Sequence, residues 1–343
     1  MIIVLTGAAG LLGGAIAHEL VRGGHSVVGL VHKDSAIQDN DGAELDAPLF
    51  DGTLPGAGEI RLLQGDVTKD GLGLSLAHRE ALANTVDCVI HCAALVRFEA
   101  DFQSLEAVNV TGTERLASLF PKARFVHVST AYSCGLREGA IPEEPHGEYE
   151  AYGNGYEQSK AIAERRLMAL RPDAIIARPS IVLGERETGR IRSFDTIYAA
   201  FKFIASGRIK AVPVAPGSTL NFVPIDHVVA GIIALATASQ TPPSVVHLVA
   251  REAIATETFL SLIGRIEGLR SPQITRPAPA KGVQDSLVQR LIQPYLSYFT
   301  RAPHFESHVI TRFAGIDAPE MGEDDMLRQI RFCVEAGFIK SKI

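Results

Sequence analysis

Short apolar runs alternate with helix-like segments from the first residue of the chain. Met1–Leu5 is apolar and too short for a helix, so it predicts a strand. Residues 14–24 place apolar side chains at helical spacing and end on paired glycines, which favour a helix stop. A second apolar run, Ser26–Val31, follows directly. The chain is therefore expected to begin with a strand, a helix and a second strand.

The same alternation continues along the chain, as a parallel sheet requires. It predicts an α/β fold, a doubly wound Rossmann-type parallel sheet with a smaller, mostly C-terminal substrate-binding lobe. The expected large domain consists of residues 1–182 together with 219–250, and the expected smaller lobe consists of residues 183–218 and 251–343. The further strands are expected at 60–67, 86–94, 123–130 and 245–249, and further helices at 107–119 and 228–236.

A glycine-rich turn joins the first strand to the first helix. In that context Gly7 permits the tight turn, Gly10 lets a pyrophosphate approach the backbone, and Gly13 allows close packing of helix on strand. This pattern predicts a dinucleotide site at the start of the helix. The other residues of the turn expected to contact the cofactor are Ala9, Leu11 and Leu12.

Ligands of open α/β sheets bind at the carboxyl ends of the strands. The third strand ends near Asp66 and Val67, and the fourth ends in the small residues Ala93 and Ala94, so all four are expected at the cofactor edge. Capping of the next helix is a second role open to Asp66. Asn109 lies within the predicted helix 107–119, where it is expected to bond to backbone near the cofactor.

The end of the second strand indicates the choice of cofactor. Sites for NAD place an acidic residue there, whereas this chain continues from Val31 into His32 and Lys33. Lys33, helped by His32, could pair with a 2′-phosphate, so NADPH is the expected cofactor. The polar stretch 35–59 is expected to form a long loop near the adenosine end.

Tyr156 and Lys160 are four residues apart in a helix-like segment. That spacing places a phenol and an ammonium on one helix face, where the cation is expected to lower the pKa of the phenol. Ser129 and Thr130 end the fifth strand, and because successive strand residues face opposite sides, only one hydroxyl is expected in the site. The arrangement suits carbonyl reduction.

Composition narrows the class of protein. The chain has 343 residues, 46% of them hydrophobic, which is enough for a large core. A net charge of −6 without a long basic run argues against nucleic acid as a partner. The apolar stretch 228–236 is too short to span a bilayer, and no charged leader precedes the first strand. The four cysteines lack close metal-ligand spacing, so free thiols in the cytoplasm, and no metal site, are expected.

These motifs, in this order and at these separations, resemble the extended short-chain dehydrogenase/reductase family. Within it the chain is most similar to the branch that reduces acyl thioesters, the thioester reductases and fatty acyl-CoA reductases of male-sterility type. The strings that carry this second resemblance are His91-Cys-Ala-Ala-Leu-Val-Arg-Phe98, His127-Val-Ser-Thr-Ala-Tyr132, Arg178-Pro-Ser-Ile-Val-Leu-Gly184 and Asn221-Phe-Val-Pro-Ile-Asp226.

The resemblance implies roles for individual residues. Tyr156 would protonate the carbonyl oxygen, Lys160 would hold the nicotinamide ribose, and Thr130 would hydrogen-bond the same oxygen. Pro179 and Ile181 would line the nicotinamide pocket. The implied substrate is an acyl thioester on coenzyme A or on an acyl carrier protein, reduced to an aldehyde or an alcohol. A homodimer is common in the family.

Other functions remain open from the sequence. A ketone or hydroxysteroid reductase and a sugar-nucleotide epimerase or dehydratase share the motifs, and a non-catalytic dinucleotide sensor is a third class. The basic excess between Leu183 and Leu220, which includes Arg190 and Arg192, suggests steering of an anionic carrier. The aromatic residues expected to line or pack the smaller lobe are Tyr295, Tyr298, Phe299 and Phe305.

Overall fold

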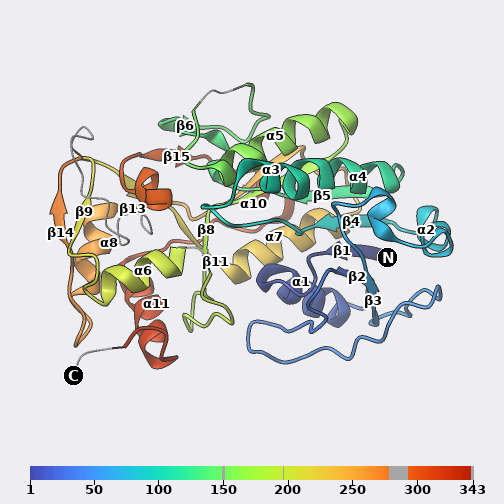
Figure 1. The fold of residues 1–343 in the computed structure, drawn as a ribbon, viewed down its shortest axis with the longest axis horizontal. Helices are drawn as coiled ribbons and strands as arrows, with labels where there is room; N and C mark the ends of the chain where they lie inside the picture. Colours follow the sequence, from blue (N-terminus) through green and yellow to red (C-terminus); the bar gives the residue numbers. More distant parts are fainter. Residues whose placement is uncertain (149–150, 196, 278–292, 341–343) are drawn as a thin grey trace.

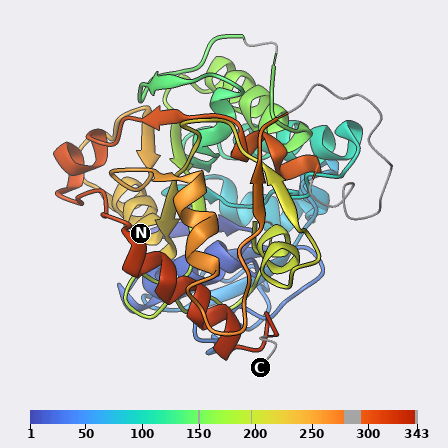
Figure 2. The ribbon, with the colours of Figure 1, turned by 90° about the vertical axis from the view of Figure 1, so that its left-hand side faces the viewer.

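The computed structural model describes residues 1–148, 151–195, 197–277 and 293–340. Figure 1 shows a larger α/β part, which contains the N-terminus, beside a smaller lobe built around β9, β14, α6, α8 and α11. Figure 2 views the molecule from the side of the smaller lobe.

The larger part is organised by a parallel sheet whose strands are all buried. Its order is β12-β7-β5-β4-β1-β2-β3, so the strand order reverses between β1 and β4. Such a reversal opens a crevice at the carboxyl ends of the strands. The predicted doubly wound Rossmann-type sheet is therefore confirmed. Its strands are β1 (Ile2–Thr6), β2 (Ser26–Val31), β3 (Ile60–Gln64), β4 (Cys88–His91), β5 (Arg124–Val128), β7 (Ile175–Pro179) and β12 (Val245–Leu248).

Helices cover both faces of this sheet. On one face, Leu20 of α1 (Leu11–Arg22), Val228 of α7 (Ile225–Thr237) and Ile310 of α10 (Val309–Ala314) belong to one buried cluster. On the other face, a second cluster includes residues of α2 (Leu76–Ala83), α4 (Gly112–Leu119) and α5 (Gly155–Leu170). Since both faces are covered, the strands are apolar along their length rather than alternating.

One expected helix is divided. Residues 107–119 form part of a longer run composed of α3 (Phe102–Leu105), the π-helix η2 (Glu106–Thr111) and α4. Asn109 lies in the π-helical turn. Such turns are rare and occur most often at functional sites, which directs attention to this residue.

The smaller lobe has its own apolar core, which also receives residues of the chain between β5 and α5. Its helices are α6 (Ile197–Ala205), α8 (Thr256–Ile263), α11 (Glu323–Glu335) and the 3-10 helix η4 (Gln293–Phe299). Short strands pair as β9 (Ala211–Pro213) with β14 (Gln273–Thr275), and β10 (Thr219–Leu220) with β13 (Ile254–Ala255). Two more pairs are β8 (Ile181–Leu183) with β11 (Phe222–Pro224), and β6 (Gly139–Ile141) with β15 (Pro303–Phe305).

The apolar stretch 228–236 is the inner part of α7, which packs on the sheet and on α1. Across the described part of the chain, no helix has the length and apolar character needed to cross a membrane. Near the C-terminus, α10 packs on β12 and α7 of the larger part, whereas α11 packs on α8 of the lobe.

Candidate active site

The glycine turn between β1 and α1 is closed by its own backbone. Gly7 adopts a φ of +69°, and a side chain there would bring a Cβ to 2.8 Å from the backbone nitrogen of Ala93. The N–H of Gly10 donates to the carbonyl of Gly7 at 2.9 Å. A Cβ on Gly13 would lie 2.1 Å from that same carbonyl oxygen. Only glycine allows the turn and helix to pack this closely.

The N-terminus of α1 fits the phosphates of a dinucleotide. Gly10 is the N-cap and provides no side-chain cap, and the first turn of the helix has no acidic residue. The backbone N–H groups of this first turn therefore keep their capacity to bind an anion, and the helix dipole favours one there. Leu11 and Leu12, which the sequence predicted to contact the cofactor, contribute two of these N–H groups.

The end of β2 and the segment after β3 lie beside each other, where the sequence places the adenosine of the cofactor. His32 and Lys33 are both exposed, and His32 Nε2 lies 3.6 Å from a carboxylate oxygen of Asp66. Asp66 accepts hydrogen bonds from the backbone and hydroxyl of Thr68, which lower the pKa of its carboxyl group. Asp66 thus stabilises a turn rather than the next helix. The Val67 side chain points away into the core, where it packs beside Gly112.

A chain of buried polar contacts holds the segment that follows β4. The Thr6 hydroxyl lies 2.7 Å from His91 Nδ1 and accepts a hydrogen bond from the Ala93 N–H at 3.1 Å. Asn109 Oδ1 accepts from the Leu95 N–H at 2.7 Å, and Asn109 Nδ2 donates to the Leu95 carbonyl at 3.1 Å. The expectation that Asn109 bonds to backbone is therefore confirmed. The contacts of Thr6 place Ala93 beside the glycine turn.

Asn109 also connects this segment to α5. Its Nδ2 donates to the Ser159 hydroxyl at 2.9 Å, and that hydroxyl donates to the carbonyl of Tyr156 at 2.8 Å. Buried polar networks that are fully paired favour one arrangement of the groups they join. Asn109 thereby positions the turn of α5 that presents Tyr156.

Helix α5 begins at a side-chain cap. The Asn154 side chain accepts a hydrogen bond from the backbone N–H of Glu157 at 3.0 Å, and Glu157 places an acidic residue in the first turn. Tyr156 follows on this turn, with its ring stacked on Phe98 at a centroid distance of 5.6 Å. Phe98 in turn contacts Tyr295 and Tyr298, so aromatic side chains surround one side of Tyr156.

The acidity of Tyr156 differs from the sequence expectation. Burial, together with the neighbouring Glu157 carboxylate, raises the pKa of the phenol, whereas the sequence predicted a pKa lowered by Lys160. Removal of the phenol from water disfavours the phenolate. The phenol is therefore fully protonated at neutral pH.

Lys160 is turned toward β5. Its ammonium donates to the carbonyl of Val128 at 2.8 Å and lies 3.1 Å from His127 Nε2. Burial lowers the pKa of Lys160 to about 8, although the carboxylate of Glu164 opposes this. Burial and the Lys160 charge also hold the pKa of His127 well below its ordinary value, so this imidazole is neutral and its Nε2 accepts from the ammonium.

The two hydroxyls at the end of β5 have different partners. Ser129 donates to the carboxylate of Glu164, which also forms a fully buried ion pair with Arg178 at 2.6 Å. Thr130 begins the 3-10 helix η3 (Ala131–Cys134), and its hydroxyl oxygen accepts from the Tyr132 N–H at 3.3 Å. Ser129 is thus occupied within the protein interior, whereas the Thr130 hydroxyl donates to no group of the described ranges and can donate to an acceptor in the site.

Pro179 and Ile181 lie on either side of the step from β7 to β8. Between them, Ser180 donates to Asn221 Oδ1 at 2.7 Å, and Asn221 Nδ2 donates to the carbonyl of Ala250 at 2.9 Å. Ile181 is partly exposed and packs against the core of the smaller lobe. The structure thus places both residues at the junction of the two parts.

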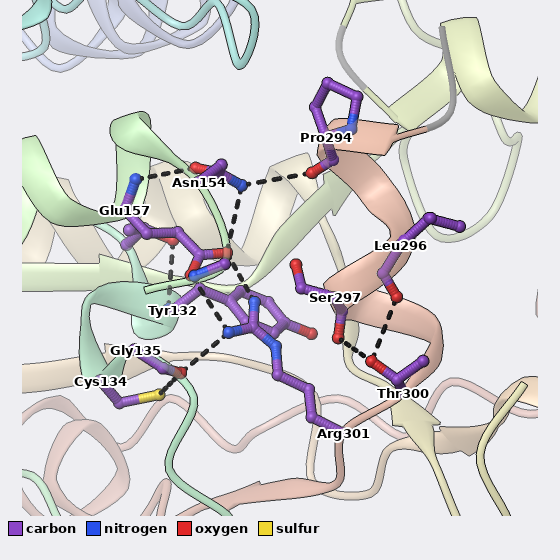
Figure 3. A network of polar contacts seen from close by, with 12 residues as sticks. Tyr132, Cys134, Gly135, Asn154, Glu157, Pro294, Leu296, Ser297, Thr300 and Arg301 are labelled. Carbon is purple, nitrogen blue, oxygen red and sulfur yellow. Dashed lines mark hydrogen bonds and ion pairs between the residues drawn. The ribbon is translucent and has the colours of Figure 1, made fainter. Parts of the chain in front are cut away.

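A buried ion pair joins the start of α5 to the C-terminal segment (Figure 3). Arg301 donates to both carboxylate oxygens of Glu157, at 2.6 and 3.1 Å, and to the carbonyl of Gly135 at 2.8 Å. Its guanidinium lies 4.7 Å from the ring centroids of Tyr132 and of Tyr298. Burial alone would lower the pKa of Arg301, but the charge and hydrogen bonds of Glu157 raise it overall.

The sequence patterns did not point to several of these residues. Glu157 and Arg301 are 144 residues apart, and Glu164 and Arg178 belong to a helix and a strand, so no spacing rule pairs them. Within the described ranges, no group of three or more acidic, histidine or cysteine side chains could hold a metal ion. The cysteines in these ranges are free thiols, and all but Cys92 are fully buried.

The chain is similar to proteins that contain reductase domains. It is 27% identical over 303 residues to a linear gramicidin synthase of Brevibacillus parabrevis, covering 80% of this chain and 6% of that protein. It is 27% identical over 287 residues to fatty acyl-CoA reductase 2 of Homo sapiens, covering 71% of this chain and 56% of that protein. The chain thus spans only part of the length of these relatives.

Solved structures show the same fold. The terminal R domain from the myxalamid PKS-NRPS biosynthetic pathway superposes with a TM-score of 0.79 at 22% identity, over 99% of this chain and 92% of that one. MoeE5 in complex with UDP-glucuronic acid and NAD gives a TM-score of 0.68 at 21% identity, over 98% and 100%.

The family assignment depends on the larger part of the chain. The sequence model of the male sterility protein family, an NAD-binding domain, matches residues 5–232, which include the glycine turn and α5. The chain therefore belongs to the male sterility protein family.

Proposed function

We propose that this protein is an NADPH-dependent reductase of an acyl thioester, presented on coenzyme A or on an acyl carrier protein. Relatives named as a fatty acyl-CoA reductase and as a thiolation-reductase di-domain support the substrate class. NADPH in place of NADH is supported by the exposed His32 and Lys33 after β2, where an NAD site has an acidic residue.

The observation that carries the proposal is the position of Tyr156 between two different surroundings. On one side of Tyr156, the same helix carries Lys160, whose ammonium is buried. On the other side, the ring of Tyr156 stacks on Phe98, which also contacts Tyr295. The polar side suits a cofactor ribose and a carbonyl oxygen, and the aromatic side suits the apolar chain of an acyl group.

In this mechanism the bound nicotinamide supplies a hydride to the carbonyl carbon. Tyr156 gives its proton to the carbonyl oxygen as negative charge develops there, and Thr130 donates a hydrogen bond to the same oxygen. The raised pKa of the Tyr156 phenol keeps that proton in place until the oxygen becomes basic. The hemithioacetal then breaks its carbon–sulfur bond, so the carrier leaves as a thiol with the hydroxyl proton and an aldehyde remains. A second hydride and proton would give the alcohol.

The test is turnover of NADPH by the purified protein with a panel of acyl-CoAs, acyl carrier proteins, aldehydes, ketones and sugar nucleotides. Tyr156→Phe should reduce kcat with thioesters by about 100-fold or more while NADPH binding persists. Tyr152→Phe is the matched control, because Tyr152 precedes α5 and its hydroxyl accepts from Arg165 at 3.3 Å. Unchanged turnover in Tyr156→Phe would refute the proton-donor role.

A sugar-nucleotide enzyme is the second candidate. It is favoured by the similar fold of MoeE5, which was solved with UDP-glucuronic acid and NAD. Epimerases keep NAD bound and use an acidic residue after the second strand, where this chain has His32. Activity confined to the sugar nucleotides of the same panel would replace the thioester proposal with this one.

A further inference from the structure

Arg192 lies beside the glycine turn, far along the chain from it. Its Nη2 is 3.4 Å from the carbonyl oxygen of Ala9, and its Nη1 donates to Gln38 Oε1 at 3.3 Å. Ala9 immediately precedes Gly10, the N-cap of α1. The guanidinium is thus held next to the helix terminus where the phosphates of a dinucleotide are expected.

The loop after β2 keeps Arg192 in this position. Asn40 is buried, and its Oδ1 accepts from the backbone N–H of Arg192 at 3.1 Å. The Asn40 Nδ2 donates to the carbonyl of Arg190 at 2.7 Å and to Glu185 Oε1 at 3.0 Å. Residues 185–192 are thereby attached to the adenosine side of the crevice rather than to the smaller lobe alone.

Among the residues that the structure describes, no carboxylate balances the charge of Arg192. Arg186 and Arg190 pair with Asp325 and Asp41, whereas Arg192 forms no ion pair with any carboxylate in the described ranges. Its Nε is buried and has no hydrogen-bond partner there. A cation next to the positive end of a helix dipole is unfavourable unless an anion lies between them. The arrangement is therefore complementary to a negatively charged ligand.

We propose that Arg192 binds a phosphate of the dinucleotide, either the pyrophosphate or the 2′-phosphate of NADPH. A guanidinium presents paired N–H donors that match phosphate oxygens, and a partly buried one forms stronger charged hydrogen bonds than an exposed one. The backbone N–H groups of α1 contact the phosphate from one side and Arg192 contacts it from the other. The role rests on the dinucleotide site and not on which carbonyl the enzyme reduces.

This role differs from the one that the sequence suggested. The basic excess between Leu183 and Leu220 was expected to steer an anionic acyl carrier. Arg190 is instead paired with Asp41, and Arg192 faces the glycine turn. The two arginines therefore belong to the cofactor side of the fold.

The experiment measures nucleotide affinity by calorimetry, without any acyl substrate, for the wild type and for Arg192→Gln, Arg192→Lys and Arg190→Gln. Arg192→Gln should raise the Kd of NADPH by about 10- to 100-fold, as expected for loss of a charged hydrogen bond. Arg190→Gln makes the same charge change two residues away at an exposed position, and its Kd should change by less than about fivefold. Arg192→Lys should fall between them, because an ammonium keeps the charge but not the paired donors.

Parallel titrations with NADH, 2′,5′-ADP and NMNH identify the phosphate. Weaker binding of NADPH and 2′,5′-ADP, but not of NADH, assigns Arg192 to the 2′-phosphate. Equal weakening of NADPH and NADH assigns it to the pyrophosphate. In both cases the loss should shrink at high salt. Thermal unfolding without nucleotide checks that the variants are folded.

Two results would overturn the proposal. One is a Kd for both dinucleotides in Arg192→Gln that matches that of Arg190→Gln. The other is an unchanged nucleotide Kd together with a raised KM for a carrier-linked thioester, which would return Arg192 to the carrier. The first result does not depend on the substrate proposal, because a phosphate contact would be detected whichever carbonyl is reduced.

Discussion

Replacing Arg301 with methionine removes the cation that pairs with Glu157 and leaves a carboxylate in the protein interior. Both side chains are nearly inaccessible, at 3% and 0% exposure. Without Arg301, Glu157 keeps hydrogen bonds from the Gly153 N–H at 3.0 Å and from Asn154. Loss of one partner of a buried pair destabilises by about 3–5 kcal/mol, against a total stability of about 5–15 kcal/mol for a typical protein.

Replacing Glu157 with glutamine should destabilise the protein less than replacing Arg301. In Glu157→Gln, Arg301 still donates to the carbonyl of Gly135 and lies over the rings of Tyr132 and Tyr298, which favour a cation. The double variant Glu157→Gln with Arg301→Met has no buried charge at this place. The double variant should therefore lose less free energy of unfolding than the two single variants together, by about 2–3 kcal/mol.

Urea unfolding followed by far-UV circular dichroism measures these losses, since the chain has no tryptophan to report by fluorescence. Arg251→Met is the control, because its pair with Glu320 is 51% and 70% exposed and should contribute less than about 1 kcal/mol. The reasoning fails if Arg301→Met loses no more stability than Arg251→Met. It also fails if the single losses add to the double loss, because the two charges would then not act as a pair.

Three further predictions follow from the site. Burial lowers the pKa of Lys160 to about 8 from its ordinary 10.5, so the unfolded chain binds more protons between these values. The free energy of unfolding of the wild type should therefore rise with pH across this window, relative to Lys160→Met, by up to about 3 kcal/mol; urea curves below pH 8 and near pH 10.5 that give the same difference would contradict it. Gly13→Ala should abolish NADPH binding in titrations and lower Tm, because the added Cβ would lie 2.1 Å from the Gly7 oxygen. Gly147→Ala is the control and should do neither, because a Cβ at that position would meet no atom within 4 Å. Asn109→Ala should lose about 1–3 kcal/mol of stability by leaving buried backbone groups unpaired and should lower kcat more than it raises KM; an unchanged kcat in steady-state assays would show that Asn109 does not position Tyr156.

Much of the larger part of the chain could be predicted because its signals are local. The unit of β1, turn and α1 follows from an apolar run, three glycines and a helical period within the first residues. The pairing of Asn109 with backbone follows from a polar residue in a buried helix. Spacing placed Tyr156 and Lys160 on α5, which begins at the cap that Asn154 provides. The glycine turn and the helix face depend on neighbours a few residues away, whereas the backbone partner of Asn109, Leu95, is 14 residues away.

The electrostatics of the site depend on the tertiary structure. Burial sets the direction of the Tyr156 pKa, opposite to the prediction from the helix face alone. The partners of Glu157 and of the glycine turn are Arg301 and Arg192, from segments that no periodicity connects to them. Sequence by itself determined which elements form and which chemistry lies on them, because turns and helix faces depend on short-range geometry. Only the fold decided which charges are desolvated and paired, because those energies depend on distance and exposure after distant segments have come together.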